Sequence, residues 1–194
     1  ARLTREQVGR CRGILDHMVG GAGTIGEGVE PRQLSDVLDD ALTGIRPAPA
    51  VERILSPAAT AARVQWPPRA VGQALRSLVT NAQDAAGADK PVRVSVEVDA
   101  GIVEVRISDS GPGMPPEVVA RIGEPFFTTK PPGRGMGMGL FLSRAVIEGI
   151  GGSLQIDSEV GRGTTVVLRV PEHAVGKSAG GAGSRTGHSV VGHP

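Results

Sequence analysis

The stretch ISDSGPGM, residues 107–114, lies where a predicted β-strand meets a glycine-containing turn. Apolar and polar residues alternate over 102–108, as they do in a strand, so Asp109 stands at the strand end. A carboxylate in that place accepts hydrogen bonds, and a purine amine would donate one worth about 1.5–3 kcal/mol. Gly111 and Gly113 would let the backbone approach a flat base closely. Taken alone, the stretch is equally consistent with a plain Asp-x-Gly turn.

The segment LVTNAQDA, residues 78–85, belongs to the strongest predicted helix, over 68–86. The apolar residues of this helix recur at helical spacing and define a buried face. Asn81 and Asp84 are three residues apart and therefore share a face. An amide oxygen is a suitable ligand for Mg²⁺, with phosphate and water completing the shell. The alternative is that both residues are ordinary surface polar residues.

Two further motifs follow, EPFFTTK at 124–130 and GMGMGL at 135–140. The first contains two neighbouring Phe residues, which we expect to anchor this loop to the body of the domain. Lys130 would reach phosphate groups, or else belong to a solvated basic loop. The second motif opens a predicted helix over 139–150, whose free N–H groups and positive dipole end attract anions. Its GxGxG pattern fits neither a Rossmann fingerprint nor a Walker A loop, because no strand leads into it and no Gly-Lys-Ser/Thr follows.

The other segments complete a predicted two-layer α/β sandwich. Helical spacing predicts further helices over 4–19, from Pro31 to before Gly44, and over 115–122. Strand patterns cover residues 51–55, 62–66, 92–98, 154–157 and 164–170. We expect the first two strands to form a pair around a turn at Ser56 and Pro57. Strand pairs joined by tight turns imply a mixed, largely antiparallel sheet, and the helices between them would cover one face.

Composition narrows the class of partner. The net charge is +1 and aromatic residues make up 2% of the 194 residues, which argues against nucleic acid as the main partner. Hydrophobic residues make up 39%, enough for a buried core. The 29 glycines indicate tight turns and a disordered tail. A single cysteine excludes an intrachain disulfide, and no apolar run approaches the roughly 20 residues that span a bilayer.

Together the four motifs, in their order and spacing, resemble the ATP-binding boxes of the GHKL ATPase superfamily, which includes gyrase and the histidine kinases. The segment GRGTT at 161–165 resembles the part that closes that fold. The similarity covers about residues 32–171, and FFTTK with a short lid at 131–138 points to sensor histidine kinases. The resemblance implies binding of ATP and Mg²⁺. It also implies phosphoryl transfer to a histidine on an upstream helical hairpin, for relay to a response regulator.

The resemblance also assigns roles to residues, none of them catalytic beyond positioning ATP. Asn81 would coordinate Mg²⁺, and Asp109 would bind the adenine amine with support from Thr164 through water. The other residues implied at the nucleotide site are Asp84, Ala85, Gly111, Gly113, Met114, Phe127, Thr128, Lys130, Gly135, Met136, Gly137, Met138, Gly139 and Leu140.

One residue departs from the family pattern. Ser77 stands four residues before Asn81, where these kinases often carry Asn and gyrase-like members carry a catalytic Glu. Because Ser77 cannot activate water as that Glu does, phosphoryl transfer is favoured over efficient ATP hydrolysis. Two alternatives are an anti-sigma-factor-type Ser/Thr kinase of the same superfamily and a nucleotide-binding module without catalysis.

The expected organisation has three parts. Residues 1–28 would be the end of a dimerisation and phosphoacceptor helical segment with a Gly-rich linker, 29–172 the ATP-binding catalytic domain, and 173–194 a disordered tail. His17 does not lie in an acceptor pattern, so we expect the acceptor histidine upstream of Ala1. The expected partners are that upstream domain, a second copy in a homodimer, and a response regulator. The domain would be cytoplasmic, with the parent protein a candidate for anchoring in the inner membrane.

The segment QVGRCRGIL, residues 7–15, resembles a helix end in RegB-type redox-sensing kinases, where a cysteine takes part in redox control. Arg10 and Arg12 flank Cys11 and would favour its reactive thiolate form. The alternative is a small buried hydrophobe, because Cys11 lies on the apolar stripe of the predicted helix. Both interpretations of Cys11 stay open.

Overall fold

The computed structural model describes residues 30–47, 50–87, 90–131 and 136–174. The expectations for the helix over 4–19, for Cys11, for Gly135 and for the tail beyond 174 lie outside the described residues. Among the helices of the described part, none is both long enough and apolar enough to cross a membrane.

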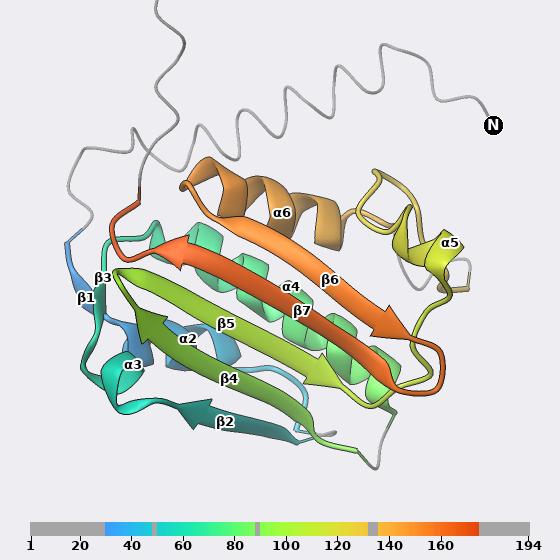
Figure 1. The fold of residues 1–194 in the computed structure, drawn as a ribbon, viewed down its shortest axis with the longest axis horizontal. Helices are drawn as coiled ribbons and strands as arrows, with labels where there is room; N and C mark the ends of the chain where they lie inside the picture. The colour runs from blue at the N-terminus through green and yellow to red at the C-terminus, as the bar shows by residue number, and fades with distance from the viewer. Residues whose placement is uncertain (1–29, 48–49, 88–89, 132–135, 175–194) are drawn as a thin grey trace, which may run out of the picture.

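A five-stranded sheet forms one layer of the domain (Figure 1). In spatial order its strands are β2 (Val51–Leu55), β4 (Val92–Asp99), β5 (Ile102–Asp109), β7 (Gly163–Pro171) and β6 (Ser153–Glu159). Every neighbouring pair is antiparallel except β2 and β4, which are parallel. The predicted mixed, largely antiparallel sheet is therefore confirmed.

Three helices form the second layer, behind the sheet in Figure 1: α2 (Leu34–Leu42), α4 (Pro68–Ala86) and α6 (Gly139–Gly149). α4 lies between the other two and packs against both. Its buried face includes Val71, Leu75, Leu78 and Val79, which recur at helical spacing. On the sheet, every second residue of β4 and β5 is buried in the same core. The two-layer α/β sandwich predicted from the sequence is thus confirmed.

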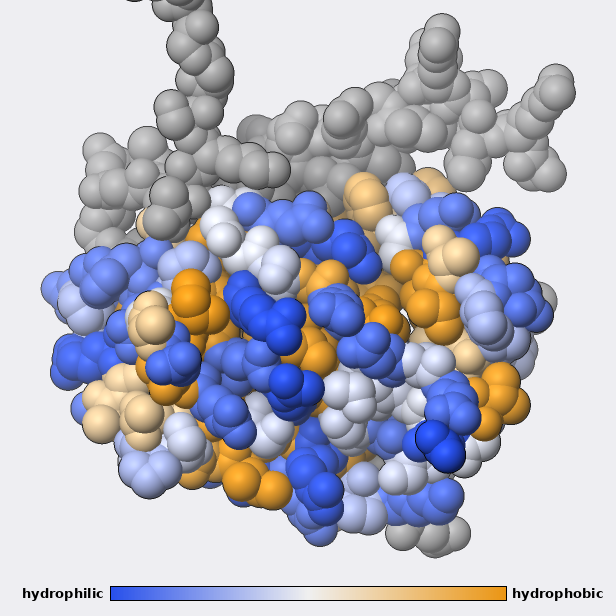
Figure 2. Space-filling view, in the orientation of Figure 1, coloured by the Kyte–Doolittle hydropathy of each residue, from blue (hydrophilic) through white to orange (hydrophobic). Residues whose placement is uncertain are grey.

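The other face of the sheet carries charged side chains (Figure 2). Glu104 on β5 pairs with Arg106 at 2.5 Å and with Arg169 on β7 at 2.7 Å. Hydrophilic side chains are interspersed with apolar ones over this face. Such a face is typical of an antiparallel sheet that has one side on the core and the other side in solvent.

The predicted strand pair over 51–66 is wrong. Residues 51–55 do form β2, but the helical turn α3 (Pro57–Ala61) follows, and β2 pairs with β4. The local reason is that Ser56 is a helix N-cap, with its Oγ accepting from Ala59 N at 3.1 Å, and Pro57 suits the first helical position. The residues read as a hairpin turn therefore begin a helix instead.

A small second sheet replaces the expected start of the helix at Pro31. β1 (Arg32–Gln33) pairs antiparallel with β3 (Arg63–Val64), so α2 begins only at Leu34. The short predicted helix over 115–122 is confirmed as a single turn, α5 (Pro116–Val119).

Trp66 fastens the segment after β3 to the end of β7. Its side chain is buried, and its Nε1 donates to Pro171 O at 2.7 Å. We predict that W66F lowers the free energy of unfolding by about 2–3 kcal/mol, because the hydrogen bond is lost and the smaller phenyl ring leaves part of the buried space of the indole unfilled. Urea denaturation checks this. The matched control V160A removes methyl groups from an exposed hairpin residue and should fall within about 0.5 kcal/mol of the unchanged chain.

Candidate functional site

The polar part of α4 holds the ammonium group of Lys130 between two side chains. Lys130 Nζ donates to Asn81 Oδ1 at 3.0 Å and to Asp84 Oδ2 at 2.6 Å. The lysine comes from the loop after α5, far along the chain from α4. Asn81 and Asp84 therefore share a face as predicted, and they act together on one cation.

Asp84 also binds Arg46, a residue that the sequence analysis missed. Arg46 Nη2 donates to Asp84 Oδ1 at 2.5 Å and to Thr80 O at 3.4 Å. Partial burial acts to raise the pKa of Asp84, but the hydrogen bonds and charges of Lys130 and Arg46 outweigh it and hold this pKa below its ordinary value. No motif contains Arg46, so no sequence signal marks it.

Asp109 ends β5 as predicted, and its side chain is buried, with 9% of the residue exposed. Burial raises the pKa of this carboxyl above its ordinary value, although hydrogen bonds from the backbone of Gly111 and Thr164 act to lower it. The Gly111 N–H reaches Asp109 Oδ1 at 2.9 Å. Thr164 lies opposite Asp109 in the β5–β7 register, which brings the two predicted residues side by side.

The glycines of the turn after β5 are packed against protein backbone. A Cβ on Gly111 would lie 2.4 Å from the carbonyl oxygen of Ala85, and one on Gly113 would lie 1.9 Å from that of Glu159. Glycine is thus required at both positions by the fold itself. The contact between Gly111 and Ala85 fastens this turn to α4, one helical turn beyond Asn81.

The glycine-rich turn before α6 also lies on α4. A Cβ on Gly139 would be 2.8 Å from Ser77 Oγ and 3.8 Å from Asn81 Nδ2. A Cβ on Gly137, whose φ is +66°, would be 2.6 Å from the backbone of Phe126 and Phe127. Little room is left at either position, so the turn sits closely against both α4 and the preceding loop.

The two Phe residues of the loop over 124–130 differ in their surroundings. Phe127 is half-buried, and the guanidinium carbon of Arg121 lies 4.2 Å from its ring centroid. Phe126 is 39% exposed, and the expectation that it anchors the loop is wrong. Its backbone has a φ of +66°, and its N–H donates to Gly137 O at 3.1 Å.

The remaining predicted residues surround these groups. Thr128 Oγ1 accepts from the backbone of Lys130 at 3.1 Å, and Met114 N donates to Ser158 Oγ at 2.9 Å. Met138 is the N-cap residue of α6, and Leu140 in its first turn packs against the core. Met136 is 82% exposed.

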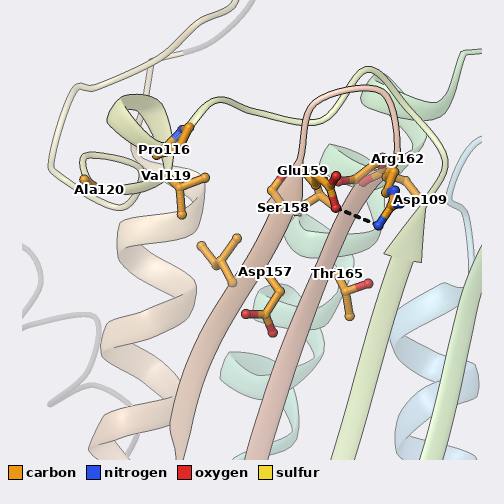
Figure 3. A pocket seen from close by; sticks show the side chains of 12 residues that line it. Asp109, Pro116, Val119, Ala120, Asp157, Ser158, Glu159, Arg162 and Thr165 are labelled. Atoms are coloured by element: carbon orange, nitrogen blue, oxygen red, sulfur yellow. Dashed lines mark hydrogen bonds and ion pairs between the residues drawn. The ribbon is translucent and has the colours of Figure 1, made fainter.

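A cavity of about 660 Å³ opens beside Asp109 (Figure 3). Its walls come from α5, from β6 and β7, and from the hairpin between these strands, where Arg162 pairs with Glu159 at 2.9 Å. Thr164 and Thr165 lie in its wall, whereas Asn81, Lys130 and Gly139 do not. The cavity therefore belongs to the Asp109 end of the candidate site.

Three comparisons with known proteins agree with this arrangement. The profile of the family described as "Histidine kinase-, DNA gyrase B-, and HSP90-like ATPase" matches residues 67–174. The chain therefore belongs to this family of ATPases, and the resemblance to the GHKL superfamily is confirmed.

Individual relatives are sensor kinases. The chain is 31% identical over 180 residues to the C4-dicarboxylate transport sensor protein DctB of Pseudomonas aeruginosa, covering 88% of this chain and 29% of that protein. It is 44% identical over 73 residues to the sensor kinase CckA of Brucella abortus, covering 38% of this chain and 8% of that protein. This chain thus spans under a third of the length of either relative.

A solved structure has the same fold. The mycobacterial sensor histidine kinase MprB superposes with a TM-score of 0.64 at 27% identity, covering 74% of this chain and 97% of that one. Its similarity confirms the fold class that the motifs predicted.

Proposed function

We propose that this chain is the ATP-binding catalytic domain of a two-component sensor histidine kinase. The observation that carries the proposal is a stripe on α4 formed by Ser77, Asn81 and Ala85, each four residues from the next. The turn before α6 lies against Ser77 and Asn81, and the turn after β5 lies against Ala85. Lys130 binds Asn81. Three segments distant in sequence thus meet on one face of one helix.

Each part of this arrangement has a chemical use in holding ATP. Asp109 would accept a hydrogen bond from the adenine amine, because a buried carboxylate beside an open cavity has room for such a donor. The first N–H groups of α6 and the ammonium of Lys130 would face the phosphates. Positioning and charge neutralisation are what phosphoryl transfer requires of a protein.

The side-chain oxygen of Asn81 suits a hard divalent cation such as Mg²⁺. It already accepts a hydrogen bond from the ammonium group of Lys130, so it stabilises a positive charge. Within the described ranges, no three His, Cys, Asp or Glu side chains gather to hold a metal by themselves. Phosphate and water would therefore supply most ligands of Mg²⁺, which when bound would neutralise phosphate charge.

The rest of the proposal concerns the whole protein. The acceptor would be a histidine on an upstream helical segment within a homodimer, and a response regulator would receive the phosphoryl group. Support comes from the sensor-kinase relatives and from Ser77, which offers no carboxylate base to activate water. Residues 29–172 would form the catalytic domain, working in the cytoplasm, where ATP is available.

The test measures binding of the non-hydrolysable analogue AMP-PNP by calorimetry, with and without Mg²⁺. We expect N81A to weaken Mg²⁺-dependent binding at least about tenfold, since about 1.4 kcal/mol of lost interaction already gives that factor. Q73A, an exposed change on the same helix, is the matched control and should bind as the unchanged chain does. No Mg²⁺-dependent binding by the unchanged chain would refute the proposal.

Transfer is tested on the full-length protein with γ-labelled ATP. Label on histidine is lost in acid, whereas label on serine or threonine persists and would favour the anti-sigma-factor-type kinase. Binding without any label on protein would favour a module that only binds the nucleotide.

A further inference from the structure

Arg46 lies between α2 and β2 and is tied to α4 by its side chain and its backbone. Its guanidinium binds Asp84 Oδ1 and Thr80 O, and its carbonyl accepts from Gln83 Nε2 at 3.0 Å. These contacts place one cation beside Asp84 on the side opposite Lys130. Arg46 itself makes no contact with Lys130 or Asn81 among the interactions of the described residues.

Asp84 therefore divides its two oxygens between two cations. Oδ1 forms an ion pair with Arg46, which lies between α2 and β2. Oδ2 forms an ion pair with Lys130, which comes from the loop after α5. If Lys130 turns to a phosphate group, Asp84 keeps the Arg46 pair. If Arg46 is absent, the same movement leaves an unpaired carboxylate close to a triphosphate, and like charges at short range repel.

We infer that Arg46 is a positioning residue of the nucleotide site: it holds Asp84 and offsets its charge, so that Lys130 can leave Asp84 for the phosphates. This inference rests on the proposed function. Arg46 acts only through Asp84, and its effect on nucleotide binding should vanish when the charge of Asp84 is removed. A merely structural role would not produce that dependence.

Arg76 provides a matched control for the structural role. Its guanidinium donates to Thr43 O and, at 2.9 Å, to Asp40 O, so it fastens the same segment after α2 to the same helix. It does not contact Asp84. Loss of Arg76 therefore loosens this segment and leaves the pair between Asp84 and Lys130 as it is.

The experiment is a double-mutant cycle on the binding constant for AMP-PNP with Mg²⁺, measured by calorimetry on the full chain. We expect R46Q to weaken binding at least about fivefold in the unchanged chain and less than about twofold in a D84N chain, a coupling within the usual range between linked groups. R76Q should change binding by the same factor in both backgrounds. R46K keeps the positive charge, so its binding should stay within about threefold of that of the unchanged chain.

The outcomes separate the two claims. Equal weakening by R46Q with and without Asp84 overturns the inference alone, because the unchanged chain still binds. Failure of the unchanged chain to bind overturns the proposed function and this inference with it. If circular dichroism shows that R46Q does not fold, R46K decides: binding more than about threefold weaker than that of the unchanged chain would contradict the role of charge.

Discussion

Replacing Asp109 with asparagine is expected to weaken ATP binding about 10–100-fold while making the free domain more stable. The loss corresponds to a charge-assisted hydrogen bond to the adenine amine, worth about 1.5–3 kcal/mol. The gain follows because burial raises the pKa of Asp109, so the ionised carboxylate costs folding free energy at neutral pH. Asparagine fits the same space and its oxygen can still accept from Gly111.

The raised pKa of Asp109 also predicts how the stability of the domain changes with pH. Because the pKa of Asp109 is higher in the folded chain than in the unfolded chain, the folded state binds more protons as this group titrates. Stability therefore falls as pH rises from the ordinary carboxyl pKa through the raised one, and the loss persists above it. In D109N this contribution to the fall should disappear, as urea denaturation across that pH range will measure.

D99N is the matched control for D109N. Asp99 ends β4, is exposed and pairs with Ile102 at the opposite end of β5 from Asp109, so neither nucleotide affinity nor stability should change by more than about 0.5 kcal/mol. If D109N bound nucleotide as tightly as the unchanged chain, the assigned role of this carboxylate would be wrong. If D109N were less stable than the unchanged chain, the conclusion that the ionised Asp109 carboxylate lowers the free energy of unfolding would be wrong.

Replacing Gly163 with alanine is expected to destabilise the domain by about 2–5 kcal/mol, which combines a left-handed backbone with steric overlap. The φ of this residue is +100°, and a Cβ would lie 2.0 Å from the backbone oxygen of Asp109. β5 and β7 would have to separate at the point where Asp109 and Thr164 pair. Since domains are stable by only about 5–15 kcal/mol, much of the margin would be lost.

Gly161 separates the two causes. It lies in the same hairpin with φ +80°, and a Cβ there would meet nothing within 4 Å. G161A should therefore show the backbone cost alone, about 1–2 kcal/mol. Thermal and urea unfolding of both variants measure the difference. Equal destabilisation by G161A and G163A would mean that the close approach to Asp109 has no energetic weight.

Local sequence patterns were sufficient for much of the fold and for placing several candidate site residues on their helices and strands. The helical spacing of apolar residues in α4 and the alternation in β4 and β5 depend only on which face is buried, and each is written in one continuous segment. Asp109 was placed correctly at a strand end for the same reason. The strand pair over 51–66 was misread because the N-cap at Ser56 gives a local signal that resembles a turn.

By itself, the sequence determined the class of domain, the helix that carries Asn81 and Asp84, and the strand that ends in Asp109. Only the tertiary structure decided that β2 runs parallel to β4, that Lys130 bridges Asn81 and Asp84, and that Arg46 holds Asp84 from the other side. It also decided that Gly111 and Gly113 pack against the backbone of other segments, at Ala85 and Glu159. The physical reason is that periodicity and capping act within a few residues, whereas strand partners and ion pairs depend on which distant segments the folded core brings within reach.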